Sequence, residues 1–173
     1  MGSTGAGPAG RGVLGLPRYS RAESRGVLLV VGAALSGLAA ELVMDVVGRW
    51  RPGDTGDYHF DWFPPIGLRN PGEGFVSSHV AVACGAVCVM ARFFPDAARP
   101  LYLYALGCAL TRMLAGAHFA TDCFGAAVLA YVLVAGMFRL PFVVDVLEAT
   151  GQRYSGARLR HAPSVAQGWG GRE

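Results

Sequence analysis

Four apolar stretches alternate along the chain with polar segments rich in Pro and Gly. The first covers residues 26–47, and the others cover 77–93, 100–114 and 119–138. A helix needs about 20 apolar residues to cross the hydrocarbon core of a bilayer, so the two middle stretches are short for independent spans. Helices that line a polar site near one membrane surface need less apolar length. The pattern therefore predicts an all-α integral membrane bundle with about four transmembrane helices.

The segments around these stretches divide the chain into three parts. Residues 1–25 are Gly-rich, polar and basic, and we predict a disordered N-terminal tail. Residues 26–142 form the predicted membrane domain, in which 48–74 is a loop, and residues 143–173 form a polar C-terminal tail that is amphipathic or disordered. A cleaved signal peptide is the alternative for the N-terminus, but Glu41 rather than a small-residue cleavage site follows the apolar run.

Small residues recur at four-residue spacing in the first predicted helix. Gly32 and Ser36 form one such pair, and Ala33 and Gly37 form another. Small side chains let two helix backbones approach closely within a membrane. We therefore expect this helix to pack tightly against a neighbour.

Composition agrees with a membrane protein and argues against nucleic-acid binding. Hydrophobic residues make up 53% of the chain and charged residues only 16%. The net charge is +3, and the fifteen basic residues, all Arg, are scattered rather than gathered into a basic stripe with interleaved aromatics. The four Cys residues lie in apolar stretches without the spacing of a zinc site. We predict no metal site and no cofactor.

The distribution of Arg predicts an orientation in the cell (inner) membrane. With four spans, both tails and the 93–100 turn share one side, which holds eleven Arg residues, while four lie on the other side. Basic residues are enriched on the cytoplasmic side of membrane proteins. The tails are therefore predicted to be cytoplasmic, with the 48–76 loop and the 112–122 segment on the extracytoplasmic face.

The 112–122 segment carries the most informative polar residues of the chain. Arg112 precedes His118 by six residues, and Asp122 follows His118 by four, within apolar sequence. Residues four apart share a face of a helix, so we expect the Asp122 carboxylate to orient the His118 ring. An oriented imidazole suits a nucleophile, and Arg is a permanent cation that suits a phosphate. Ionisable residues inside a membrane are costly, which favours a functional role.

Two further segments are predicted to meet this one on the extracytoplasmic face. Arg49 and Arg51 follow the first helix, while Ser77, Ser78 and His79 begin the second. Ser77 is a good helix N-cap, and the free N–H groups of the first turn form an anion site. Arg51 adds contacts to phosphate oxygens, and His79 can protonate a leaving oxygen. Together they suit in-line phosphoryl transfer to His118, followed by hydrolysis of a phosphohistidine.

The three segments, G-R-W-R-P, V-S-S-H and T-R-M-L-A-G-A-H-F-A-T-D, resemble the signature of the type 2 phosphatidic acid phosphatase (PAP2) superfamily. That signature is usually written KxxxxxxRP, PSGH and SRxxxxxHxxxD. The resemblance implies a metal-independent membrane phosphatase. In it His118 is the nucleophile, oriented by Asp122, and His79 is the general acid. Phosphate contacts come from Arg51, Arg112, Ser77 and the backbone at Ser78.

The chain departs from this signature at several positions. Met44 stands at the position of the family Lys, and Arg49 is the candidate for a partial substitute in binding phosphate. Val76 and Ser78 replace Pro and Gly, and Thr111 replaces a Ser while keeping a hydroxyl. Family members usually carry more helices before the first motif, so we expect either a minimal member without those helices or a sequence that begins downstream of the natural start.

The resemblance implies hydrolysis of a phosphomonoester or diphosphate on a membrane lipid, with the bilayer as the surroundings of the enzyme. Phosphatidic acid, phosphatidylglycerophosphate, a polyprenyl diphosphate and lipid A are the candidate substrates. A lipid phosphotransferase that uses the same histidine is one alternative, and a catalytically degenerate membrane scaffold or lipid binder is another. Assembly into a homo-oligomer is left open.

Overall fold

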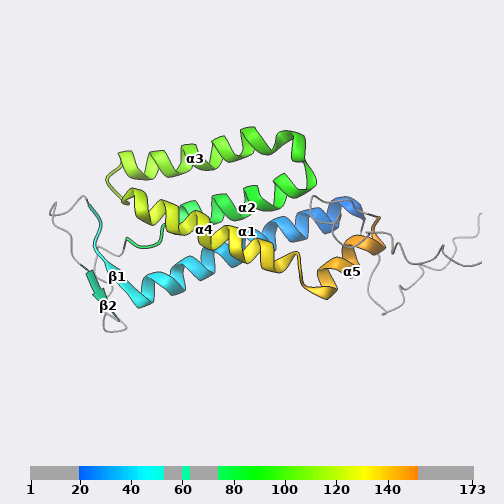
Figure 1. Cartoon of the computed structure of the whole chain (residues 1–173), viewed down its shortest axis with the longest axis horizontal. Coiled ribbons are helices and arrows are strands. Elements are labelled where there is room, and N and C mark those ends of the chain that lie inside the picture. Colours follow the sequence, from blue (N-terminus) through cyan, green and yellow to red (C-terminus); the bar gives the residue numbers. More distant parts are fainter. Residues whose placement is uncertain (1–19, 53–59, 63–73, 152–173) are drawn as a thin grey trace, which may run out of the picture.

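The computed structural model describes residues 20–52, 60–62 and 74–151, and this part of the chain is mostly helical. Its elements are, in order, α1 (Arg21–Val46), β1 (Val47–Arg49), β2 (Phe60–Trp62), α2 (Ser78–Phe93), a 3-10 turn (Pro95–Ala97), α3 (Ala98–Leu114), α4 (Ala120–Met137) and α5 (Pro141–Ala149). The first four long helices lie roughly along one direction, with the β1–β2 pair at one end of the bundle and α5 at the other (Figure 1).

Helix α1 begins five residues before the predicted start, because a capping box fixes its first turn. The Ser20 hydroxyl accepts a hydrogen bond from the Glu23 N–H at 3.2 Å, and the Glu23 carboxylate accepts one from the Ser20 N–H at 2.6 Å. The prediction of a disordered segment up to residue 25 is therefore wrong for its last five residues, which are helical. The rest of that predicted tail, residues 1–19, lies outside the described residues.

Helix α2 is the central helix and packs against α1, α3 and α4. Gly32, Ser36 and Gly37 of α1 are buried at this contact, which confirms the expected close packing of that helix. A Cβ added at Gly85 of α2 would lie 2.5 Å from Ser36 Oγ and 2.8 Å from the main-chain oxygen of Gly32. The approach of α1 and α2 therefore depends on the missing side chain at Gly85.

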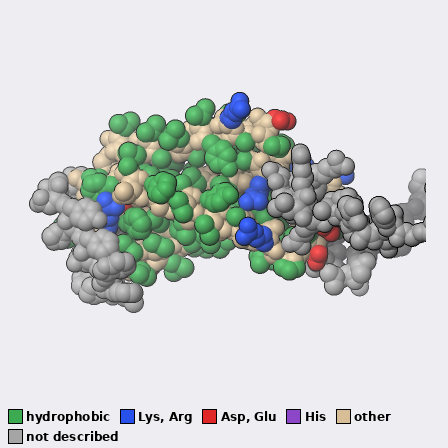
Figure 2. Space-filling view, viewed as in Figure 1, with side chains coloured by type: hydrophobic (Ala, Val, Ile, Leu, Met, Phe, Trp, Pro, Cys, Tyr) green, Lys and Arg blue, Asp and Glu red, His purple; other side chains and the backbone are tan. Residues whose placement is uncertain are grey.

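Many large apolar side chains lie on the outside of the bundle, and several of the fully buried positions carry Ala. The fully buried positions include Ala40, Ala81, Ala126 and Ala130. The exposed positions include Leu38 and Leu42 of α1, Leu103 and Tyr104 of α3, and Phe124 and Val132 of α4. In Figure 2 apolar side chains cover most of the described surface on the face shown. An apolar exterior of this extent is typical of a surface that faces lipid or a partner rather than water.

Two helices in the described part of the chain are long and apolar enough to cross a membrane. These are α1, with 26 residues, and α4, with 18 residues. Helix α2 is apolar but has 16 residues, and α3 has 17. The bundle of about four transmembrane helices stays a prediction.

The predicted 48–74 region contains two short strands, which the sequence did not predict, within a fold that is otherwise helical. Strands β1 and β2 pair antiparallel, with Gly48 opposite Asp61 and Arg49 opposite Phe60. The chain leaves the helix at the β-branched residue Val47, whose backbone is extended. All of β1 is buried, so it belongs to the packed end of the bundle rather than to a solvated loop.

The first residues of the predicted C-terminal tail lie in a helix, which fits the amphipathic rather than the disordered alternative for them. Helix α5 buries Val143, Val144 and Leu147, and its first residue is Pro141. Pro141 lies just beyond the fourth predicted helix, and Pro is favoured in the first turn of a new helix. The end of α5 is tied to the start of α1, because the Arg21 side chain donates to the Thr150 carbonyl at 2.9 Å. Residues 152–173 lie outside the described residues.

The close contact of α1 with α2 gives a stability prediction. Gly85→Ala places a methyl group against Ser36 and Gly32, and we expect a loss of about 1–3 kcal/mol in the free energy of unfolding from overpacking. The matched control is Gly107→Ala in α3, where an added Cβ meets nothing within 4 Å. Thermal unfolding of both variants in the same detergent checks this. Equal midpoints for the two variants would contradict the tight α1–α2 contact.

Candidate active site

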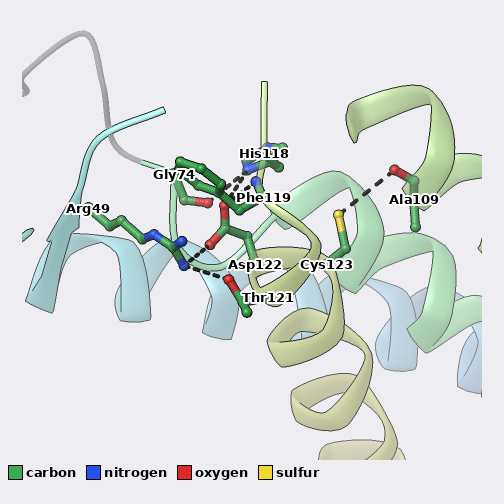
Figure 3. A network of polar contacts seen from close by, with 8 residues as sticks. All are labelled: Arg49, Gly74, Ala109, His118, Phe119, Thr121, Asp122 and Cys123. Atoms are coloured by element: carbon green, nitrogen blue, oxygen red, sulfur yellow. Dashed lines mark hydrogen bonds and ion pairs between the residues drawn. The ribbon is translucent and has the colours of Figure 1, made fainter. Parts of the chain in front are cut away.

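Three segments that are distant in sequence meet at the end of the bundle that carries β1 and β2. They are β1 itself, the chain from Gly74 into the start of α2, and the turn from α3 into α4 (Figure 1). The sequence predicts that these segments converge. Side chains of the first and third segments and the Gly74 carbonyl of the second form the network of polar contacts drawn in Figure 3.

The network is centred on Asp122, in the first turn of α4, whose side chain is fully buried. One carboxylate oxygen lies 2.7 Å from a terminal nitrogen of Arg49, and this nitrogen also donates to Thr121 Oγ1 at 2.7 Å. The other carboxylate oxygen accepts the N–H of Phe119 at 2.7 Å, which caps the helix. The guanidinium of Arg49 lies over the Phe119 ring, 4.4 Å from its centroid. Both oxygens of Asp122 are thus engaged by these groups.

His118 is held by a main-chain carbonyl. Its Nδ1 lies 2.7 Å from the oxygen of Gly74, whereas the nearest Asp122 oxygen is 3.9 Å away, too far for a hydrogen bond. A carbonyl only accepts, so Nδ1 carries the proton and Nε2 of the neutral ring keeps its lone pair. The expected hydrogen bond from His118 to Asp122 is therefore replaced by one to Gly74 (Figure 3).

A tight turn sets the position of His118. Gly116 has φ +66°, in the left-handed region that favours glycine, and its N–H donates to the Met113 carbonyl at 3.0 Å. The Ala117 N–H donates to the Arg112 carbonyl at 3.1 Å. His118 therefore lies in the turn, two residues before α4 begins, and the same-face rule for helices does not apply to His118 and Asp122.

The surroundings of His118 favour its neutral form. Burial lowers the pKa of His118 below its ordinary value, and the hydrogen bond to Gly74 offsets part of this effect. The positive charges of Arg51 and Arg112, together with the nearby His79, lower the pKa of His118 further.

The start of α2 supplies polar groups with unused hydrogen-bonding capacity. Ser77 occupies the N-cap position, but its side chain makes no capping hydrogen bond. Its hydroxyl is fully buried and has no partner within the described part of the chain. Nε of Arg112 is likewise buried with no partner there. Ser78 begins the helix and is half-buried, while His79 is exposed.

Several contacts in the network were missed by sequence reasoning. Gly74 was not singled out, although its carbonyl holds His118 and its N–H donates to the Arg49 carbonyl. Thr121 and Phe119 were also missed as partners of Arg49 and Asp122. A main-chain carbonyl has no sequence signature, so no signal could have found Gly74. Met44, at the place of the family Lys, is buried in α1.

The described residues contain no group of three or more His, Cys, Asp or Glu side chains that could hold a metal ion.

Comparison with known proteins places these residues in a family context. The sequence model of the PAP2 superfamily matches residues 25–144, which include all three motif segments. The chain belongs to the PAP2 superfamily. Curated relatives include two proteins named lipid A 1-phosphatase, from Rhizobium johnstonii and Rhizobium etli. Each is 30% identical over 97 residues, which is 56% of this chain.

The match covers only part of these relatives. This chain spans 40% of the Rhizobium johnstonii protein and 42% of the Rhizobium etli protein. No solved structure matches the chain.

The lowered pKa of His118 predicts how stability depends on pH. The unfolded chain binds a proton at His118 more readily than the folded one, so His118 lowers folding stability as pH falls below about 6.5. In His118→Gln this contribution is absent, while the amide can still donate to Gly74. We expect the stability advantage of the parent over this variant to shrink between about pH 7 and pH 5, measured by thermal unfolding in detergent. An advantage that grows toward acid pH would contradict a depressed pKa.

Proposed function

We propose that this PAP2 protein is a phosphatase that removes phosphate from a membrane lipid through a phosphohistidine at His118. The observation that carries the proposal is the state of that ring. Its Nδ1 is fixed by Gly74, and its pKa is lowered by burial and by Arg51 and Arg112. A neutral imidazole with a free Nε2 beside permanent cations suits attack on phosphorus.

In the proposed first step, Nε2 of His118 attacks phosphorus in line with the leaving lipid oxygen. The bond from phosphorus to that oxygen breaks as the one to nitrogen forms, and His79 delivers a proton to the leaving oxygen. Water then attacks the phosphohistidine, inorganic phosphate leaves, and His79 takes the proton back from the water. Neutral His118 and protonated His79 are thereby restored.

The charge that spreads over the phosphoryl oxygens needs donors on several sides. Arg51 and Arg112 supply bidentate cations, and the first turn of α2 supplies the N–H of Ser78. Supporting this assignment, the Ser77 hydroxyl and Nε of Arg112 are buried without a partner in the described residues, although buried polar groups are normally hydrogen-bonded. A phosphate bound here would satisfy both groups.

The relatives guide the choice of lipid. Two of them carry the name lipid A 1-phosphatase, so we place a phosphate on a lipid A type glycolipid first among the substrates. Phosphatidic acid, phosphatidylglycerophosphate and a polyprenyl diphosphate present the same phosphoryl group on an apolar anchor and are the alternatives.

The apolar exterior supports placing the bundle in a bilayer, with four helices as spans in the cell (inner) membrane. The end of α2, which carries Arg92, and the turn between α4 and α5, which carries Arg139, lie at the end of the bundle opposite the candidate site. The excess of basic residues in the segments at that end favours cytoplasmic tails and a site that faces the extracytoplasmic leaflet.

Phosphate release by the purified chain in detergent tests the function. The panel is lipid A, phosphatidic acid, phosphatidylglycerophosphate and undecaprenyl diphosphate, each with EDTA. We expect release that persists in EDTA, is highest with lipid A, and falls at least about 10³-fold in His118→Ala, which lacks the nucleophile. Arg139→Gln, an exposed change at the far end, is the matched control and retains the parental rate.

Other outcomes of this assay separate the rival functions. Loss of lipid phosphate without free phosphate, dependent on an added acceptor, would identify a phosphotransferase. Binding of lipid phosphate with no turnover by the folded protein would identify a scaffold, for which the buried Met44 in place of the family Lys is the supporting feature.

Reporter fusions test the orientation. A fluorescent protein fused after residue 173 folds only in the cytoplasm, whereas alkaline phosphatase fused there is active only outside it. We expect fluorescence and no alkaline phosphatase activity, because the tails carry the excess of Arg. The reverse result would place the candidate site on the cytoplasmic face.

A further inference from the structure

The Arg49–Asp122 pair lies beside the proposed nucleophile, yet neither member forms a hydrogen bond to its ring. The carboxylate is fully buried and the Arg49 side chain is 9% exposed, with 2.7 Å between the charged atoms. The Asp122 oxygen nearest to the ring accepts the hydrogen bond of the Phe119 N–H and lies 3.9 Å from His118 Nδ1. The ring proton goes to Gly74 instead.

We propose that Arg49 is a positioning residue, which neutralises Asp122 and holds its carboxylate away from His118 so that the Gly74 carbonyl alone fixes the nucleophile. This assignment rests on the proposed function for its catalytic meaning. It also differs from the role that the sequence predicted for Arg49, which was a contact to phosphate.

The main-chain contacts of Arg49 support the same role. Its carbonyl accepts the N–H of Gly74, and the carbonyl of Gly74 accepts the proton of His118. Arg49 therefore contacts both groups that decide the state of the ring. With its side chain it holds the competing acceptor, Asp122, and with its backbone it holds the acceptor that His118 uses.

The consequence of removing Arg49 follows from the charges that face His118. Burial opposes a positive ring, and so do Arg51, Arg112 and His79, while the Gly74 carbonyl favours one. The carboxylate of Asp122, 3.9 Å from Nδ1, is an anion that would also favour a positive ring. Without the Arg49 cation, Asp122 is a buried carboxylate that has lost its counter-ion, and such a charge strongly favours a positive neighbour. His118 would then bind a proton near neutral pH and lose its nucleophilic lone pair.

The test measures the ring directly. The full chain, labelled with [15N]histidine in detergent micelles, gives the tautomer and titration midpoint of each of its four histidines. His118→Gln identifies the His118 signals. In the parent we expect a neutral ring with the proton on Nδ1. In Arg49→Met the midpoint of His118 should rise by about 1 pH unit or more, because an opposite charge about 4 Å away is no longer neutralised.

Three further variants test whether the effect of Arg49→Met comes from the lost positive charge or from lost side-chain packing. Arg49→Lys keeps the cation and should keep the parental midpoint to within a few tenths of a pH unit. The double variant Arg49→Met with Asp122→Asn removes both charges and should return the midpoint toward the parental value. Arg139→Met, an exposed Arg at the far end, is the matched control and should shift nothing.

Asp122→Asn alone keeps the test decisive if Arg49→Met does not fold. The amide oxygen still accepts the Phe119 N–H, and Gly74 still accepts from His118. We therefore expect the Nδ1–H tautomer to persist in this variant. A mixture of tautomers would show that the carboxylate itself orients the ring, and it would overturn the proposal.

Kinetics on the lipid A substrate provide the second readout. In Arg49→Met the acid limb of kcat/KM should move to higher pH with the ring midpoint, and kcat should fall about 100-fold at neutral pH. A rise in KM with an unchanged His118 titration would make Arg49 a phosphate contact and overturn the proposal. A parent chain without activity would refute the proposed function alone, since the ring titrations decide the role of Arg49 independently.

Discussion

The buried ion pair of Arg49 and Asp122 is the contact on which the candidate site depends. It joins the strand after α1 to the first turn of α4, across 73 positions of sequence. Neither charge is tolerable alone at this depth, since an unpaired buried ion costs several kcal/mol. The pairing, together with the hydrogen bonds to Thr121 and Phe119, offsets the free-energy cost of burying the two charges. It also fixes the position of β1 relative to the first turn of α4.

The helix bundle provides the rigid support for this pair. Gly32, Ser36 and Gly85 have small side chains or none, which allows the backbones of α1 and α2 to pack closely. Buried Ala residues allow close packing elsewhere in the core. Packing of small residues suits a membrane interior, where bringing helices together gains little from the hydrophobic effect. The polar groups of the candidate site lie at one end of the bundle, where helices begin and end and where main-chain donors and acceptors are available.

The cations at this end serve two linked purposes in the proposed reaction. Burial lowers the pKa of His118, and Arg51 and Arg112 lower it further, which favours a neutral ring in the absence of substrate. The same charges suit the oxygens of a phosphoryl group. Binding of a dianion would offset their positive potential at the moment when His118 becomes bonded to phosphorus and gains positive charge. The protonation state of the His118 ring and the binding of phosphate by Arg51 and Arg112 are therefore electrostatically coupled.

The sequence determined the long helices, their small-residue contact and the grouping of the three motif segments, because apolar length and residue spacing are local properties. It did not reveal β1, β2 or α5, whose few residues carry weak local signals and depend on burial at the ends of the bundle. It placed Asp122 on the ring of His118 by helix geometry, but the turn at Gly116 takes His118 out of the helix. Only the tertiary structure decided that Gly74 holds the ring and that Arg49 holds the carboxylate. Those partners are a main-chain carbonyl and a side chain far away in sequence, and neither is specified by residue type or spacing.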